Sequence, residues 1–195
     1  MWEQLDKYKD YITSHFPNEK DDELLGRWDG TKEQPFIYPH VTSILEKTIH
    51  QPGLVNYWKK NTVNAIKKRG EETSDIGKQL HKIFDANVNG YGIEVPPEFA
   101  EHNRVFREWM LKHSVTPIKT EFKVVSEKYG FSGSPDFFGE VDGELEVVDW
   151  KTGNIFGDIW GDQVAAYQMA ICEMLQVPLD SIGFRILQVK SDGGE

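Results

Sequence analysis

Two acidic residues and a lysine stand close to a strong turn signal in the segment 131–154. The dipeptide Asp142-Gly143, flanked by β-forming residues, is typical of a two-residue type I′ hairpin turn. Such a turn places residues at equal distance from it opposite one another, so Asp136 is predicted to face Asp149. Lys151 follows two positions later and therefore shares the face of Asp149. We expect the three side chains to cluster at one end of this hairpin.

This arrangement favours metal-assisted chemistry on a phosphodiester. Two opposed carboxylates repel each other, and a hard divalent cation held by carboxylates and water relieves the repulsion. Magnesium is the first candidate and manganese the second. Lys151 could hold or deprotonate the attacking water, or stabilise charge on a phosphate. The alternative is an exposed hairpin end with an Asp–Lys surface pair.

Pro135 complicates the predicted register. A proline within a strand marks an edge or a bulge, because it has no N–H to donate. A bulge would shift the register by one residue and move Asp136 to the other face of the sheet.

The surrounding elements are predicted as helices first and strands afterwards. Helices are expected over 2–13, from Thr42 or Ser43, over 52–68, from Thr73 or Ser74 to about Val88, from Pro96-Pro97 to about His113, and over 162–175, with a long loop over 14–40. Strands are expected over 119–126, 131–141, 144–150 and 181–189. This order predicts one α/β domain over 1–195, with a mostly helical part over 1–116 and a β-β-β-α-β core over 117–190.

Several segments resemble a known nuclease family. Pro135-Asp136 followed by Asp149-Trp150-Lys151 resembles the PD-(D/E)XK motif, and the surrounding VVDWKT resembles its RecB-like branch, especially the mitochondrial genome maintenance exonucleases and their phage relatives. Three further segments match in order: VTSIL over 41–45, Gly77-x-x-x-His81 and Gln163-x-x-x-Tyr167. Each motif alone is weak, but together they cover about residues 36–190 in the expected order.

The resemblance implies a restriction-endonuclease-like α/β fold, a mixed β-sheet core flanked by helices. It implies that Asp136, Asp149 and the backbone carbonyl of Trp150 bind Mg²⁺, with Mn²⁺ able to substitute. Lys151 would be catalytic and His81 an additional metal ligand. The chain has a single cysteine, Cys172, so it cannot form the four-cysteine Fe–S cluster found in some RecB-like nucleases.

The same resemblance gives DNA-binding candidates, each with a simpler alternative. Gln163 and Tyr167 share a helix face and could contact a nucleotide, or they could belong to a half-buried amphipathic helix. Thr152, beside Lys151, is a further candidate DNA contact. His81 could instead be a surface histidine or pair with Asp85, one turn away. Gly77 is costly within a helix, and the close approach of a strand or of substrate would explain it.

Glu121 is a candidate additional acid, because the family often has a glutamate on the strand before the catalytic hairpin. Its direction depends on the turn near Glu127–Gly130. A four-residue turn places Glu121 opposite Asp136, on the face of the site, whereas a turn one residue shorter points it away.

Composition limits the protein classes. The 195 residues carry a net charge of −10, which argues against a protein that passively coats nucleic acid. Five basic residues between Lys59 and Arg69 form either a solvated helix face or a phosphate-contacting surface. The N-terminus lacks signal or transit character and no stretch has the length of a membrane span, so we expect a soluble cytoplasmic protein with no membrane partner.

The predicted site favours a Mg²⁺-dependent DNA nuclease, and the resemblance implies an exonuclease acting on single-stranded or free-ended DNA in replication, recombination or repair. The compact size suggests a phage or bacterial origin. A structure-specific endonuclease with the same site is one alternative. A non-catalytic DNA-binding or assembly module is another, although such a module has no reason to keep opposed carboxylates.

Overall fold

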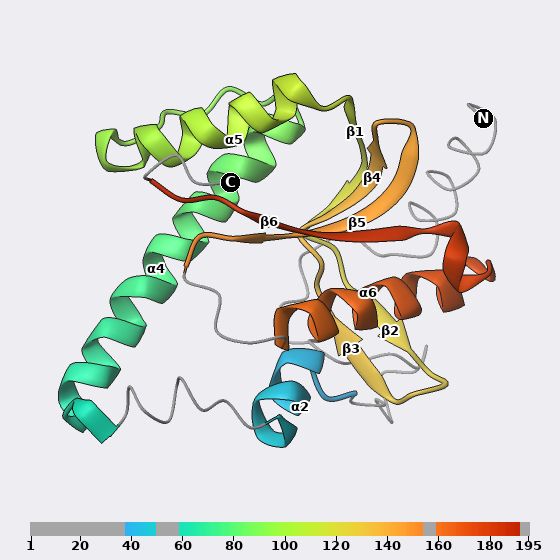
Figure 1. The fold of residues 1–195 in the computed structure, drawn as a ribbon, viewed down its shortest axis with the longest axis horizontal. Coiled ribbons are helices and arrows are strands. Elements are labelled where there is room, and N and C mark those ends of the chain that lie inside the picture. The colour runs from blue at the N-terminus through green and yellow to red at the C-terminus, as the bar shows by residue number, and fades with distance from the viewer. Residues whose placement is uncertain (1–37, 50–58, 154–158, 192–195) are drawn as a thin grey trace, which may run out of the picture.

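A mixed four-stranded sheet lies at the centre of the computed structural model, which describes residues 38–49, 59–153 and 159–191 (Figure 1). Its strand order is β1-β4-β5-β6, with β5 and β6 parallel and the other neighbours antiparallel. The strands are β1 (Val115–Thr120), β4 (Phe137–Val141), β5 (Glu144–Lys151) and β6 (Gly183–Gln188). A separate antiparallel pair is formed by β2 (Val124–Ser126) and β3 (Phe131–Gly133). The predicted mixed sheet with a helical N-terminal half is confirmed.

Helices cover both faces of this sheet (Figure 1). They are α2 (Val41–Thr48), α4 (Val63–Val88), α5 (Ala100–Lys112), which follows a 3-10 turn at Pro97–Phe99, and α6 (Ile159–Leu175). On one face, Val148 of β5 packs with the core residues of α4 and α5. On the other, Val147 packs with those of α6 and α2. The alternation along β5 therefore separates two cores, as expected for a strand buried on both sides.

The hairpin turn between β4 and β5 has the predicted geometry. Asp142 and Gly143 both have positive φ, 54° and 89°, as a type I′ turn requires. The ladder runs from Val141 opposite Glu144 to Phe137 opposite Val148. The register derived from the sequence is thus confirmed up to the residue after Asp136.

Two predicted strands are each broken into two, at positions that face each other. The segment 119–126 divides at Glu121, whose φ of 46° takes it out of the extended region, and 131–141 divides at Ser134–Asp136. The backbone N–H of Glu121 donates to the carbonyl of Asp136 at 3.0 Å, so the two breaks are joined. Pro135 cannot donate to a ladder, which accounts for one of them.

The start of the helical half differs from the prediction. Residues 63–68 of the helix expected over 52–68 and the helix expected from Thr73 or Ser74 form one helix, α4, whereas residues 59–60 are helical but separated from it by residues 61–62. The N-cap of α4 is Thr62, whose side chain accepts from the Ala65 N–H. The hydroxyl of Thr73 donates to a carbonyl within the same helix and caps nothing. In α2 the N-cap is His40 rather than Thr42 or Ser43. The helix predicted over 2–13, nearly all of the loop 14–40, and residues 52–58 lie outside the described residues.

An aromatic cluster fixes α4 against the end of β5. Trp150, fully buried, meets Phe84 and Phe106 edge-on at 5.9 and 5.3 Å, and these two rings stack at 4.2 Å. Such pairs favour defined geometries over loose contact. Because Phe84 lies three residues after His81, this packing also decides where His81 points.

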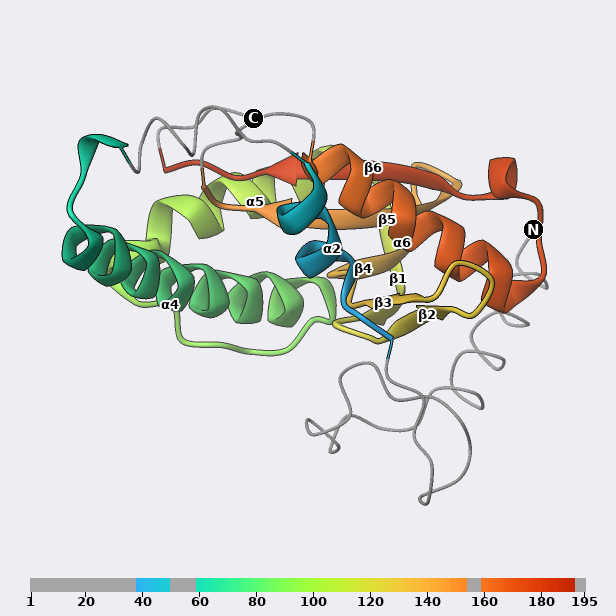
Figure 2. The same cartoon turned by 90° about the horizontal axis from the view of Figure 1, so that it is seen from below.

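The N-terminal half of α4 extends beyond the sheet (Figure 2). Lys67 and Lys68 are exposed and pair with Glu71 and Glu72 at 4.0 and 3.8 Å, which agrees with a solvated helix face. Whether this basic segment contacts phosphates stays a prediction. Across the described part of the chain, no helix combines the length and apolar character needed to cross a membrane.

Candidate active site

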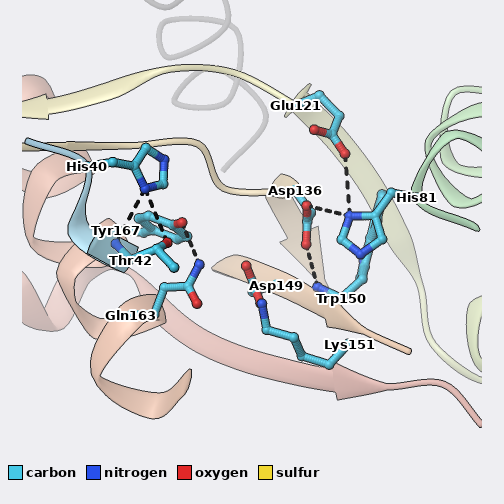
Figure 3. Close-up of polar contacts among 10 residues, drawn as sticks. All are labelled: His40, Thr42, His81, Glu121, Asp136, Asp149, Trp150, Lys151, Gln163 and Tyr167. Carbon is cyan, nitrogen blue, oxygen red and sulfur yellow. Dashed lines mark hydrogen bonds and ion pairs between the residues drawn. The ribbon is translucent and has the colours of Figure 1, made fainter. Parts of the chain in front are cut away.

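Asp136 lies at the end of the sheet, where it joins the β4–β5 hairpin to α4. Its Oδ1 is 3.0 Å from Nδ1 of His81, and its Oδ2 accepts the backbone N–H of Trp150 at 2.6 Å (Figure 3). The side chain is buried, with 7% exposed. The β4–β5 ladder ends at Phe137. The predicted cross-strand pair of Asp136 and Asp149 is therefore not part of the ladder. In the break at Ser134–Asp136, the Asp136 carboxylate instead extends toward His81 and the backbone N–H of Trp150.

His81 reaches this carboxylate from the C-terminal half of α4. Burial lowers the pKa of His81, but hydrogen bonds and charge from Asp136 and Glu121 outweigh burial and raise it to about 10. The imidazole therefore carries a proton at neutral pH in the metal-free protein. The alternative pairing with Asp85 is wrong, because His81 Nδ1 contacts Asp136 and Glu121, while Asp85 accepts a hydrogen bond from the side chain of Asn89.

Glu121 completes a group of three possible metal ligands. Its Oε1 is 3.8 Å from Nδ1 of His81, and the four-residue turn after Ser126 gives the register that was required to place it there. Burial raises the pKa of Glu121, and the charges of Asp136 and Asp85 add to this, while His81 opposes it. The structure thus places Glu121 next to His81 and Asp136.

These three residues, here called the ligand group, are compatible with a divalent ion. One ligand atom from each of His81, Glu121 and Asp136 lies within 4.8 Å of the other two. Two carboxylates and one imidazole suit magnesium or a divalent first-row transition-metal ion such as manganese. In Figure 3 the three side chains, from α4, from the break after β1 and from the start of β4, point toward one another.

Asp149 forms a second, adjoining part of the site with Lys151. The Asp149 side chain is 3% exposed, and its Oδ2 is 2.5 Å from Nζ of Lys151, which is 19% exposed. Burial and the charge of Asp136 raise the pKa of Asp149 to about 6, against the opposing effect of Lys151. The alternative of an exposed surface pair is therefore wrong, since both partners are largely buried. The two carboxylates lie at the same end of the hairpin, because Asp136 accepts the backbone N–H of Trp150, the residue after Asp149.

Comparison with known families agrees with this geometry. A family model described as the PD-(D/E)XK nuclease superfamily matches residues 86–194, more than half of the chain. The chain belongs to this superfamily. A search of curated proteins finds no match. The matched segment contains Asp136, Asp149 and Lys151, whereas His81 lies before it.

Membership of the PD-(D/E)XK superfamily gives the ligand group a chemical context. Nucleases of this superfamily use divalent metal ions, and the carboxylates and imidazole at the sheet end supply the donors that such an ion needs. Trp150, between the two motif residues Asp149 and Lys151, contributes its backbone N–H to Asp136. The role of its carbonyl as a ligand stays a prediction.

The Gln163 and Tyr167 pair lies beside this superfamily site but is buried. Gln163 Nε2 donates to the Tyr167 hydroxyl at 2.7 Å, and the two side chains belong to residues that are 8% and 1% exposed. The Tyr167 ring lies against Gly133, where an added Cβ would be only 2.2 Å from Cε1. The structure therefore shows Tyr167 as a core residue, and DNA contact by this pair stays a prediction.

Thr152 and Gly77 meet at the side of the site nearest α4. A Cβ built on Gly77 would lie 3.9 Å from Oγ1 of Thr152, an ordinary van der Waals distance. The close approach of a strand to Gly77 is therefore wrong. Approach of substrate stays a prediction, as does DNA binding by Thr152.

Trp160 is a neighbour of the site that the sequence did not single out. The Nζ of Lys151 lies over its indole ring, 5.4 Å from the ring centroid. Helical spacing could have pointed to Trp160, because it precedes Gln163 by three residues and so shares its helix face.

Proposed function

We propose that this superfamily member is a Mg²⁺-dependent deoxyribonuclease of the RecB-like branch, related to the mitochondrial genome maintenance exonucleases and their phage relatives, and that it removes nucleotides from single-stranded or free-ended DNA. The observation that carries this proposal is the Asp149–Lys151 ion pair beside the ligand group at one end of the sheet. The ordered VTSIL, Gly-x-x-x-His, PD, DWK and Gln-x-x-x-Tyr motifs support the branch.

The metal would be held by Asp136, Asp149, His81 and the Trp150 carbonyl, with Glu121 as an additional ligand. When bound, Mg²⁺ supplies positive charge that activates water and stabilises the phosphate oxygens, and Mn²⁺ is expected to substitute. The oxygen-rich donor set favours these ions, since both accept carboxylate, carbonyl and water ligands.

Lys151 supplies the second positive charge of the site. Its ammonium is held at the edge of a largely buried carboxylate, where electrostatic interactions are stronger than in bulk water. There it can stabilise negative charge on the phosphate, or hold the proton of the attacking water. Asp149 orients the ammonium, and the Trp150 N–H orients Asp136.

The DNA would pass the face where α4 and α6 meet the end of the sheet. Thr152 lies there beside Gly77, and Gln163 and Tyr167 belong to the adjoining helix, α6. Exposed aromatic and basic side chains of the helical half could add stacking and phosphate contacts to a single strand. We further propose a cytoplasmic role in DNA replication, recombination or repair.

Cleavage of defined DNA substrates tests the proposal. Purified protein with Mg²⁺ is given end-labelled single-stranded DNA, end-labelled duplex DNA and covalently closed circular DNA, with EDTA and the Asp149→Asn variant as controls. We expect mononucleotides or short products from the linear substrates, an intact circle, and no cleavage in either control. Cutting of the circle would instead assign a structure-specific endonuclease, and binding without cleavage in every metal would leave a non-catalytic DNA-binding module.

A further inference from the structure

We propose that Trp160 is a positioning residue for Lys151, and that its indole face holds the lysine ammonium in the orientation used for cleavage. This inference rests on the proposed nuclease function. It concerns a residue outside the motifs, in the first turn of α6.

The contact joins the end of β5 to the start of α6. Lys151 is the last residue of β5, and its Nζ lies 5.4 Å from the centroid of the half-buried Trp160 ring. A cation within about 6 Å of an aromatic face is attracted by the negative face of the ring, most strongly for tryptophan. Lys151 is only 19% exposed, so water screens this attraction less than it would at an open surface.

Lys151 needs an aromatic partner because Asp149, its ion-pair partner, is also a proposed metal ligand. Within the described part of the chain, the ammonium of Lys151 contacts Asp149 and the Trp160 ring. If Asp149 also binds the divalent ion, its negative charge is shared and its attraction for Lys151 falls. The flexible four-carbon stem of lysine would then be free to take other rotamers. The indole face keeps its attraction, because it carries no charge that the metal could neutralise.

An aromatic partner also leaves the charge of Lys151 available. A second carboxylate in the same place would compete with the phosphate for the ammonium, whereas the uncharged indole orients the cation without neutralising it. This is the property required of a group that holds Lys151 ready for an anionic substrate.

The helix that carries Trp160 is fixed by its packing. Ile159, its neighbour, is buried, and Val164 one turn later is fully buried in the core beneath the helix. Tyr167 is held in contact with Gly133 and hydrogen-bonded to Gln163. The first turn of α6 therefore offers Trp160 on a rigid support, which a positioning residue needs.

Kinetics of conservative and non-conservative variants test this role. We expect Trp160→Leu to lower kcat on single-stranded DNA with Mg²⁺ by roughly 10- to 100-fold. KM should change by less than about twofold, since substrate binding is not removed. Trp160→Phe, which keeps an aromatic face, should restore most of kcat. Tyr129→Leu is the matched control, because it removes a similar contact, with Lys128 Nζ 4.9 Å from the Tyr129 centroid, in the β2–β3 turn.

The kinetic outcomes separate positioning from other roles. A Trp160→Leu variant with normal kcat would overturn the inference, as would one in which only KM rises, because that pattern indicates a direct DNA contact. Failure of Trp160→Phe to restore kcat, with both variants folded by circular dichroism, would overturn it as well. A wild-type protein that cleaves no DNA would refute the proposed function, which is a different result.

A spectroscopic measurement tests the contact without relying on activity. In protein labelled with ¹³C-lysine, the ε-methylene protons of Lys151 should be shifted upfield by the ring current of Trp160. The signal is assigned by its loss in Lys151→Arg. It should move to the position of exposed lysines in Trp160→Leu and stay shifted in Trp160→Phe. An unshifted Lys151 signal in the wild-type protein would overturn the inference whatever the kinetics.

Discussion

The carboxylate of Asp136 and the imidazole of His81 lie 3.0 Å apart, although 55 positions separate them in the sequence. In the metal-free protein a proton lies between them, because the pKa of His81 is about 10. Both groups are also proposed metal ligands, and a histidine must lose its proton from the ligating nitrogen to bind an ion. Metal and proton therefore compete for the same place.

Metal binding should release this proton. We expect calorimetric titration with Mn²⁺ near neutral pH, in two buffers of different ionisation enthalpy, to show release of about one proton per ion. Affinity should increase with pH for the same reason. The His81→Asn variant should release no proton from this position and lose the corresponding pH dependence. If the wild-type protein binds metal with no proton release, His81 is a hydrogen-bond partner of Asp136 and not a ligand.

The same pKa shift predicts how the metal-free protein responds to pH. Since the pKa of His81 is raised from 6.5 to about 10, its contribution to stability is fully present below pH 6.5 and is lost as pH rises through about 10. The shift of Asp149 from 3.8 to about 6 acts at lower pH, so the two effects are separable. Urea unfolding in EDTA, compared between wild type and His81→Asn, checks this. The difference in unfolding free energy between the two proteins should shrink as pH rises from 6.5 to about 10, and a constant difference would contradict the assigned shift of His81.

The two motif residues of the ion pair should have different effects when replaced. We expect Lys151→Ala to lower cleavage by at least about 100-fold while largely preserving fold and metal binding, because it leaves the ligand group intact. Asp149→Asn should abolish both cleavage and metal binding, because it removes a proposed ligand. Rates are measured on labelled single-stranded DNA and metal affinity by calorimetry. Near-normal turnover in either variant would contradict the proposed mechanism.

The parts of the site that the sequence could predict are those fixed by local signals. The Asp142-Gly143 turn sets the register of β4 and β5, and this brought Asp149 and Lys151 to the predicted strand end. The arrival of His81 depends on Phe84 packing against Trp150, a contact between distant segments that no local pattern specifies. The break at Glu121 was missed because β-forming residues continue on both sides of it. Only the pairing with Asp136 shows why the chain turns there.

Tyr167 and Gly133 should prove to be coupled in stability. A Cβ at Gly133 would lie 2.2 Å from Cε1 and 2.7 Å from Cδ1 of a ring that cannot move easily, since Tyr167 is 1% exposed. We expect Gly133→Ala to destabilise the fold by roughly 1–3 kcal/mol through overpacking. In a Tyr167→Leu background the added cost should be much smaller. Urea unfolding of the four proteins of this cycle gives the coupling, and simple additivity would show that the ring can move aside.

Two glycines of α4 offer a comparison between helix stability and access to the site. An added Cβ meets nothing within 4 Å at Gly70 and only Thr152 Oγ1, at 3.9 Å, at Gly77. Replacing either glycine by alanine should therefore stabilise the helix by about 1 kcal/mol, the usual difference in helix propensity.

Their effects on cleavage should differ. Gly77 lies one turn before His81, and its new methyl group would point toward Thr152, beside the proposed catalytic residue Lys151, into space that the proposed DNA path needs. We expect Gly77→Ala to be more stable than wild type and slower in cleavage, with a higher KM, while Gly70→Ala is more stable and fully active. Thermal melting and steady-state rates on single-stranded DNA measure both properties. Full activity of Gly77→Ala would show that substrate does not approach α4 at this turn, and the glycine would then need another explanation.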